Sequence, residues 1–173
     1  MQTKIPSDAA LGELAQRVGT ALKAQHLMLV TAESCTGGWI AKAATDLGGS
    51  SDWFDSGIVA YSYEAKQAFL GVRPQTLETH GAVSRETVIE MVSGALVHSG
   101  ASIAVAVTGI AGPSGGTTDK PVGTVWLAWK RRGGYPAARS FHFEGDRDAV
   151  RRQTVDAAFR ELELLVGSPQ PSA

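Results

Sequence analysis

Four apolar residues near the start of the chain are spaced as on one face of a helix: Leu11, Leu14, Val18 and Leu22. They follow Pro6-Ser7-Asp8, which is typical of a helix start. Leu27 to Ala32 is instead a short apolar run typical of a strand, and Trp39 to Thr45 returns to a helical pattern. The first quarter of the chain therefore predicts a helix, a strand and a second helix.

The middle of the chain continues this alternation. Ser56 to Ser62 predicts a second strand, a short helix follows from about Glu64 to Leu70, and Thr76 to His80 is turn-like. Ser84 stands where it would cap a longer helix. Five residues form the apolar face of that helix: Val88, Met91, Val92, Ala95 and Leu96.

The second half of the chain holds the most continuous apolar segment. Ser102 to Thr108 is almost entirely Ile, Val and Ala, which predicts a strand buried on both faces. A loop rich in Gly, Pro, Ser and Thr follows from Gly109 to Pro121. Val122 to Lys130 and Ala138 to Phe143 then predict two strands, joined by a hairpin turn over Arg131 to Pro136.

Together these elements define the expected fold. A last helix begins near Asp146, and residues 1–6 and 167–173 are expected to be frayed. Helices interleaved with strands, plus a final hairpin, predict one three-layer α/β/α domain over residues 1–173, with a mixed, mostly parallel sheet. A chain of 173 residues is long enough to bury the core of such a domain.

Composition narrows the expected partners and location. Apolar residues make up 43% of the chain, as in globular proteins, and the formal net charge of −1 disfavours nucleic-acid binding. A single cysteine, Cys35, excludes an intrachain disulfide and fits a reducing compartment. No apolar stretch approaches the roughly 20 residues that span a bilayer. We therefore expect a cytoplasmic protein that binds neither membrane nor nucleic acid.

The segment Thr31-Ala32-Glu33-Ser34-Cys35-Thr36-Gly37-Gly38 is the first candidate site. A strand that enters a helix through two glycines can aim backbone N–H groups at a small anion, or build an oxyanion hole around a nucleophile such as Ser34. Ser34 and Thr36 equally fit the simpler role of helix caps. Cys35 is a rival nucleophile, but a lone small cysteine is more often buried packing, and we favour that role.

A serine that cleaves an amide needs a base, and Lys66 is a candidate. The four histidines are scattered and form no His–Asp partnership: His26, His80, His98 and His142. Lys66 follows a strand end in the first turn of a helix, and burial would lower its pKa enough for this role. A lone lysine on a helix is otherwise a solvated side chain, so both interpretations stay open.

Two further segments have features of an anion site. Four glycines follow the buried strand, as phosphate-binding loops require: Gly109, Gly112, Gly115 and Gly116. They match neither a Walker A nor a Rossmann pattern. Arg147 and Arg151 are one helical turn apart, which suits either a bidentate grip on an anion or an exposed surface pattern. No His, Cys, Asp or Glu cluster has metal-ligand spacing, so we expect no metal and no cofactor.

Seven blocks of the chain, in order, resemble the CinA C-terminal-domain family. They are Thr31–Gly38, Gly48–Ser51, Tyr61-Ser62 with Glu64–Lys66, Gly81–Ser84, Thr108–Pro113 with Gly115-Gly116, Lys120–Val125 and Gly145–Asp148. The resemblance covers nearly the whole chain. It implies a serine amidohydrolase that converts nicotinamide mononucleotide (NMN) into nicotinate mononucleotide and ammonia, in pyridine-nucleotide recycling.

The resemblance also implies roles for single residues. The family's serine falls on Ser34, its lysine on Lys66 and its threonine on Thr108, which implies a Ser/Lys acyl-enzyme mechanism. Many relatives carry Asn where this chain has Tyr63, so Tyr61 and Tyr63 are both candidates for proton transfer. Substrate contacts are expected from Glu33, Cys35, Thr36, Gly37, Gly38, Gly109, Gly112, Gly115, Gly116, Arg147 and Arg151.

Several alternatives stay open. The 5′-phosphate of the substrate fits the Gly109–Gly116 loop, the Thr36–Gly38 helix start or Arg147. A non-catalytic nucleotide-sensing module, or an amidase for another small carboxamide, would use the same pocket. We also expect a homodimer, because small α/β enzymes often associate by two-fold symmetry, and Trp53 and Phe54 suit either that contact or the core.

Overall fold

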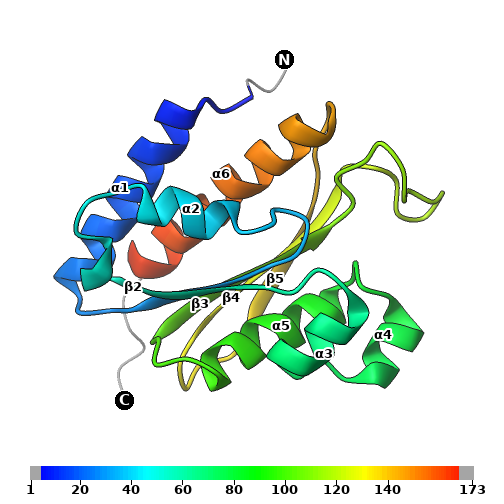
Figure 1. The fold of residues 1–173 in the computed structure, drawn as a ribbon, viewed down its shortest axis with the longest axis horizontal. Helices are drawn as coiled ribbons and strands as arrows, with labels where there is room; N and C mark the ends of the chain where they lie inside the picture. Colours follow the sequence, from blue (N-terminus) through cyan, green and yellow to red (C-terminus); the bar gives the residue numbers. More distant parts are fainter. Residues whose placement is uncertain (1–4, 168–173) are drawn as a thin grey trace.

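The structure is a computed structural model that describes residues 5–167 as a five-stranded sheet between two layers of helices (Figure 1). The strands lie in the order β2 (Phe54–Val59), β1 (Leu29–Glu33), β3 (Ile103–Gly109), β4 (Thr124–Arg131) and β5 (Ala137–His142). β2, β1 and β3 are parallel, whereas β4 pairs antiparallel with both β3 and β5. Four of the five strands therefore run in one direction, and the expectation of a mixed, mostly parallel sheet is confirmed.

Helices cover both faces of this sheet (Figure 1). One layer contains α1 (Asp8–Ala24), α2 (Trp39–Thr45) and α6 (Arg147–Gly167), and the other contains α3 (Tyr63–Leu70), α4 (Pro74–His80) and α5 (Arg85–Val97). A short 3-10 helix, η1 (Ser50–Asp52), precedes β2. Of the ends expected to be frayed, residues 1–4 and 168–173 lie outside the described residues, and Gly167 is the last residue of α6.

Side-chain caps begin the helices near the predicted positions. Ser7, Ser62 and Ser84 accept hydrogen bonds from backbone N–H groups in the first turns of α1, α3 and α5, and Asp146 does the same for α6. The prediction of a turn over Thr76–His80 is wrong, because this segment belongs to α4. That helix begins at Pro74, whose ring suits the first helical position because no N–H is needed there.

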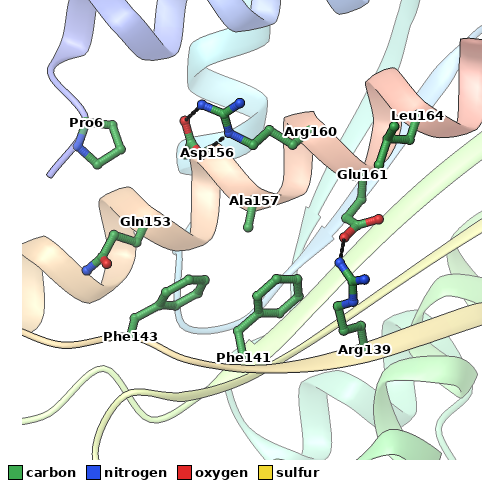
Figure 2. A pocket seen from close by; sticks show the side chains of 10 residues that line it. All are labelled: Pro6, Arg139, Phe141, Phe143, Gln153, Asp156, Ala157, Arg160, Glu161 and Leu164. Atoms are coloured by element: carbon green, nitrogen blue, oxygen red, sulfur yellow. Dashed lines mark hydrogen bonds and ion pairs between the residues drawn. The ribbon is translucent and has the colours of Figure 1, made fainter. Parts of the chain in front are cut away.

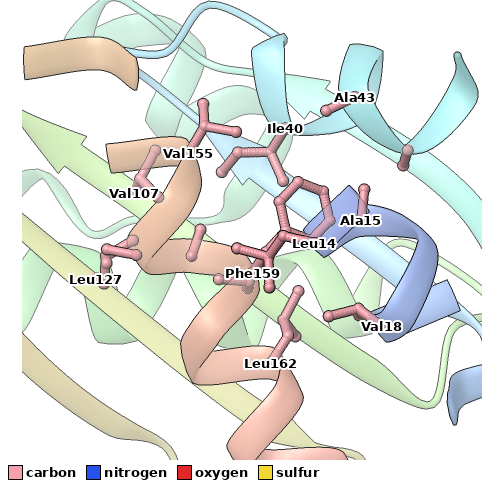
Figure 3. Close-up of a cluster of buried hydrophobic side chains, with 14 of the residues drawn as sticks. Leu14, Ala15, Val18, Ile40, Ala43, Val107, Leu127, Val155, Phe159 and Leu162 are labelled. Atoms are coloured by element: carbon pink, nitrogen blue, oxygen red, sulfur yellow. The ribbon is translucent and has the colours of Figure 1, made fainter. Parts of the chain in front are cut away.

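The larger core cluster lies between the sheet and the layer of α1, α2 and α6 (Figure 3). Phe159 of α6 is fully buried among side chains of α1, α2, β3 and β4, and burial of such a side chain contributes about 1.5–3 kcal/mol. Trp53 belongs to the same cluster, and its indole lies so close to Gly19 of α1 that a Cβ there would be 2.6 Å from it. Of the two roles considered for Trp53, the structure supports the core.

The strand register brings distant segments together at one edge of the sheet. Glu33, the last residue of β1, lies opposite Val59 of β2 on one side and Val107 of β3 on the other. Hydrogen bonds continue just past the strand, from the Ala60 N–H to the Glu33 carbonyl and from the Ser34 N–H to the Val107 carbonyl. The residues that follow three parallel strands therefore meet at their carboxyl ends, where open α/β sheets bind ligands.

Candidate active site

The loop from Ser34 to Gly38 joins the end of β1 to the start of α2. Gly37 and Gly38 have φ values of +61° and +96°, in the left-handed region that glycine adopts without strain. The Gly37 N–H bonds the Ser34 carbonyl at 3.0 Å. Within residues 5–167, the N–H groups of Cys35, Thr36 and Gly38 have no oxygen acceptor.

Glu33 holds the start of α2 from inside the protein. Its carboxylate is fully buried and accepts four hydrogen bonds. The donors are the Thr36 hydroxyl at 2.7 Å, the Ile40 and Ala41 N–H groups at 2.9 Å each, and the Thr31 hydroxyl at 3.1 Å. A carboxylate at a helix N-terminus is favoured by both the free N–H groups and the helix dipole. Glu33 therefore holds the loop in place from the protein interior, and its carboxylate does not face solvent.

Lys66 reaches from α3 to the nucleophile candidate. Its Nζ lies 2.9 Å from Ser34 Oγ and 3.0 Å from each of the carbonyl oxygens of Ala60 and Tyr61. Only 1% of the lysine is exposed, and none of the ion pairs among the described residues includes it. Burial without a carboxylate partner lowers the pKa of Lys66 from 10.5 to about 8. The structure thus brings together the two residues that the sequence suggested as nucleophile and base.

Cys35 has the packing role favoured from the sequence. Its side chain belongs to the core cluster on the α1, α2 and α6 side of the sheet. Burial raises the pKa of the Cys35 thiol to about 12, which leaves almost no thiolate near neutral pH. Burial and this raised pKa both disfavour Cys35 as the nucleophile.

The remaining candidates for proton transfer differ in where their hydroxyl groups lie. Tyr61 is 59% exposed, and its phenol oxygen accepts a hydrogen bond from Arg147 at 3.0 Å. Tyr63 is turned toward the start of α5, where its hydroxyl accepts a longer bond of 3.3 Å from the Ala82 N–H. Thr108 is buried and donates to the Ala82 carbonyl at 2.8 Å. Tyr63 and Thr108 are thus both engaged by Ala82.

The glycine-rich loop after β3 folds back onto the start of β4. A Cβ on Gly109 would lie 2.7 Å from Val125 Cγ2, and one on Gly116 would lie 2.7 Å from the Val122 nitrogen. Gly112 and Gly115 have φ values of +83° and +92°. These glycines are therefore required for close packing and for left-handed backbone. The loop is tied to α4 by Lys120, whose Nζ donates to the His80 carbonyl at 2.8 Å.

The two arginines of α6 bind separate loops. Arg147 donates to the Gly112 carbonyl at 2.8 Å and to the exposed Tyr61 hydroxyl at 3.0 Å. Arg151 donates to the carbonyls of Cys35 and Thr36, at 3.1 and 3.0 Å. Trp39 was not among the predicted site residues; the centre of its ring lies 5.0 Å from the guanidinium carbon of Arg151 and 4.9 Å from that of Arg152.

A cavity of about 440 Å³ lies away from this site, between β5 and α6 (Figure 2). Its floor is formed by Phe141 and Phe143, whose rings stack 5.4 Å apart, and its rim includes the ion pair of Arg139 and Glu161. None of the predicted site residues lines it. The cavity is therefore separate from the Ser34 site.

Within residues 5–167, every helix is too short or too polar to span a bilayer.

Fold and site together define an α/β domain with a buried serine–lysine pair at the carboxyl edge of its parallel strands. The model of the CinA C-terminal domain family matches residues 11–166, and the chain belongs to this family.

Individual relatives cover most of the chain. The chain is 53% identical over 156 residues to "Nicotinamide-nucleotide amidohydrolase PncC" of Escherichia coli (strain K12), which covers 90% of this chain and 94% of that relative. A Pseudomonas putida protein of the same name is 53% identical over 152 residues, covering 88% and 94%. The crystal structure of competence/damage inducible protein CihA from Agrobacterium tumefaciens has a TM-score of 0.89 at 45% identity, covering 96% of this chain and 100% of that one.

Proposed function

We propose that this chain is an amidohydrolase that converts NMN and water into nicotinate mononucleotide and ammonia. The observation that carries the proposal is the buried contact of 2.9 Å between Ser34 Oγ and Lys66 Nζ. The names of the relatives from Escherichia coli and Pseudomonas putida, each 53% identical, support the reaction class and the substrate class.

Lys66 acts as the base in its neutral form. A neutral amine has two N–H groups and one lone pair. The carbonyls of Ala60 and Tyr61 accept the two N–H groups, so the lone pair faces the Ser34 hydroxyl. Because burial lowers the pKa of Lys66 to about 8, an appreciable share of the protein holds the neutral form near neutral pH. Lys66 therefore takes the Ser34 proton as the oxygen attacks.

Ser34 Oγ attacks the carboxamide carbon of the nicotinamide ring, and the carbonyl oxygen becomes an oxyanion. The N–H groups of Cys35, Thr36 and Gly38 are the donors that receive it, since none has another oxygen acceptor among the described residues. Lys66 then returns its proton to the nitrogen of the leaving group, and ammonia departs. Water hydrolyses the acyl-enzyme: Lys66 takes a proton from the water and returns it to Ser34 Oγ.

Residues around the pair have supporting roles. Tyr61, with its hydroxyl held by Arg147, is a better proton relay than Tyr63 or Thr108, whose hydroxyls bond Ala82. Arg147 is exposed and charged, and we assign the 5′-phosphate to it and to the adjoining Gly109–Gly116 loop. Glu33, with four internal bonds, orders the Ser34 loop and does not contact the substrate.

Ammonia release from NMN by the purified protein, in the presence of a metal chelator, tests the proposal. We expect turnover by the wild type and none above background by Ser34→Ala or Lys66→Ala. Lys42→Ala, which removes an exposed lysine paired with Asp46, is the matched control and should keep full activity. Full activity of either site variant would refute the Ser34 and Lys66 assignment.

Two other functions would use the same pocket. A nucleotide-sensing module would raise its melting temperature with NMN but release no ammonia. An amidase for another small carboxamide would release ammonia from that compound and not from NMN. The buried, uncharged setting of Lys66 favours catalysis, because a binding module has no use for a desolvated base.

We further propose that the protein is a cytoplasmic homodimer. The single cysteine is a buried free thiol, as suits a reducing compartment. Light scattering in solution tests the oligomeric state. A mass of about twice the 18.1 kDa of one chain is the expected result, and a mass of one chain would exclude the dimer.

A further inference from the structure

Arg151 contacts the nucleophile loop on the side opposite to Lys66. Lys66 belongs to α3 in one helix layer, whereas Arg151 belongs to α6 in the other (Figure 1). The Arg151 Nε donates to the Cys35 carbonyl at 3.1 Å and its NH2 group to the Thr36 carbonyl at 3.0 Å. A Cβ on Gly37 would lie 3.6 Å from the same NH2 group, so the guanidinium lies directly against the loop.

The direction of these bonds determines where the loop N–H groups point. In a trans peptide the C=O and the N–H of one unit point in opposite directions. The Cys35 carbonyl belongs to the same peptide unit as the Thr36 N–H. Because Arg151 holds that carbonyl toward α6, the Thr36 N–H points away from α6. A carbonyl bonded to a cation also makes the N–H of its own unit a stronger donor.

We propose that Arg151 is a positioning residue, whose planar guanidinium holds two loop carbonyls and so fixes the direction of the loop N–H groups that the proposed mechanism assigns to the oxyanion. The inference rests on the proposed function at Ser34. Glu33 holds the other end of the same loop through the Thr36 hydroxyl and the first N–H groups of α2. The loop is thus fixed between a buried carboxylate and a guanidinium before substrate arrives, as oxyanion stabilisation requires.

The chain offers a matched control for this role. Arg152 also lies against the Trp39 ring, at 4.9 Å, but its hydrogen bonds go to Asp8, Asp148 and the Pro6 carbonyl and not to the loop. Arg151→Lys keeps the charge and the long stem beside Trp39 and lacks the fork that can bond two carbonyls. Arg151→Ala removes both.

Steady-state kinetics with NMN separate positioning from binding. We expect Arg151→Ala to lower kcat about 100-fold, as loss of an oxyanion donor does, while KM stays within about twofold of the wild type. Arg151→Lys should also have a lowered kcat, and added guanidinium should restore part of the kcat of Arg151→Ala. Arg152→Ala should stay close to the wild type.

A raised KM with unchanged kcat in Arg151→Ala would overturn the inference, since Arg151 would then bind substrate. An equal loss in Arg152→Ala would overturn it too, since the effect would then act through Trp39.

A second reaction distinguishes failure of this inference from failure of the proposed function. A fluorophosphonate phosphonylates an activated serine: Ser34 Oγ bonds to phosphorus, fluoride leaves, Lys66 takes the proton, and the phosphoryl oxygen needs the same N–H donors. Mass spectrometry follows the rate. Slower labelling of Ser34 in Arg151→Ala than in Arg152→Ala supports the inference even if the wild type releases no ammonia from NMN, which would refute only the proposed substrate. Equal labelling rates, or no labelling of the wild type, would overturn it.

Discussion

Lys66 combines two properties that ordinarily exclude each other, a charged side chain and nearly complete burial. The protein tolerates it because three oxygen atoms surround the amine and because its pKa is lowered to about 8. The activity should reflect this titration. In the proposed mechanism Lys66 is the base and acts when neutral, so kcat/KM should increase about tenfold per pH unit below pH 8 and level off above it. A profile that stays flat between about pH 6 and pH 9 would contradict Lys66 as the base.

The same lysine should lower the stability of the protein. Its pKa is about 8 when folded and near 10.5 when exposed, so the unfolded chain binds the proton more tightly. The free energy of unfolding should therefore be about 3 kcal/mol lower below pH 8 than above pH 10.5, since one pKa unit corresponds to about 1.4 kcal/mol.

Lys66→Met should accordingly stabilise the protein while abolishing activity. We expect a gain of about 1–2 kcal/mol at pH 7, less than the full 3 kcal/mol because the carbonyls of Ala60 and Tyr61 lose a donor. The gain should shrink as the pH rises from 8 to 10.5. In that range the folded wild type has released the Lys66 proton, whereas the unfolded chain still holds it. Urea unfolding at two pH values measures this, with exposed Lys42→Met as the control. A destabilised Lys66→Met at pH 7 would contradict the argument.

Residue types were easier to predict from the sequence than their directions. Ser34 and Lys66 were candidates because of their chemistry, and the structure brings them into contact. Glu33 and Arg151 were expected to contact substrate. In the structure Glu33 accepts bonds from N–H groups at the start of α2, and Arg151 donates to loop carbonyls. Side-chain direction depends on which helix packs against the loop, and one sequence does not contain that information in its local pattern.

At the scale of elements, the position of α3 depends on its contact with α5. A Cβ on Gly94 of α5 would lie 1.8 Å from the Leu70 carbonyl oxygen at the end of α3. Gly94→Ala should therefore push α3 away, lower the free energy of unfolding by about 3 kcal/mol or more, and reduce activity because Lys66 moves with its helix.

The matched control for this substitution is Gly12→Ala in α1. No atom lies within 4 Å of the Cβ that it would add, and alanine is the better helix former. Gly12→Ala should raise stability by about 0.5–1 kcal/mol and leave activity unchanged. Thermal unfolding and ammonia release measure both variants. Comparable stability of the two variants would mean that α3 adapts without cost.

The elements with a long or continuous apolar pattern were predicted correctly, and the exception is informative. β3 is buried along almost its whole length, as the run of Ile, Val and Ala from 103 to 107 indicated. α4 has only seven residues, and just Thr76 and Leu77 are buried. So short a helix buries too few side chains to create a periodic pattern, and its stability comes from packing against α5 rather than from its own sequence.

At the scale of the whole molecule, the cavity between β5 and α6 is lined by none of the candidate site residues (Figure 2). Phe141→Ala would remove a half-buried ring that stacks on Phe143 and lies 5.7 Å from the Arg139 guanidinium. We expect the free energy of unfolding to fall by about 1–2 kcal/mol, less than for a fully buried phenylalanine, with kcat/KM within about twofold of the wild type. A large loss of activity in a folded Phe141→Ala protein would show that the two regions are coupled.

The alternation of strands and helices in the sequence predicted the layered architecture. It did not predict the hydrogen bonds between distant loops. Arg147 reaches Gly112 and Tyr61, and Lys120 reaches His80. These bonds join segments that are 35 to 86 residues apart, and each uses a backbone carbonyl or a phenol that has no distinctive local pattern. These hydrogen bonds can be predicted only once the strand register is known, because the register brings the loops to one edge of the sheet.

The order in which the chain is synthesised gives α6 a particular importance. Ser34 and Lys66 both lie in the first 70 residues, whereas Arg147 and Arg151 belong to the last helix. α6 also covers the apolar face of α1, the first helix, so the earliest hydrophobic surface is completed by the latest element. Because synthesis proceeds from the N-terminus, a nascent chain on the ribosome contains Ser34 and Lys66 before the two arginines that bond the surrounding loops. We therefore expect the site to be completed only after α6 has left the ribosome, and a chain truncated before α6 to release no ammonia from NMN.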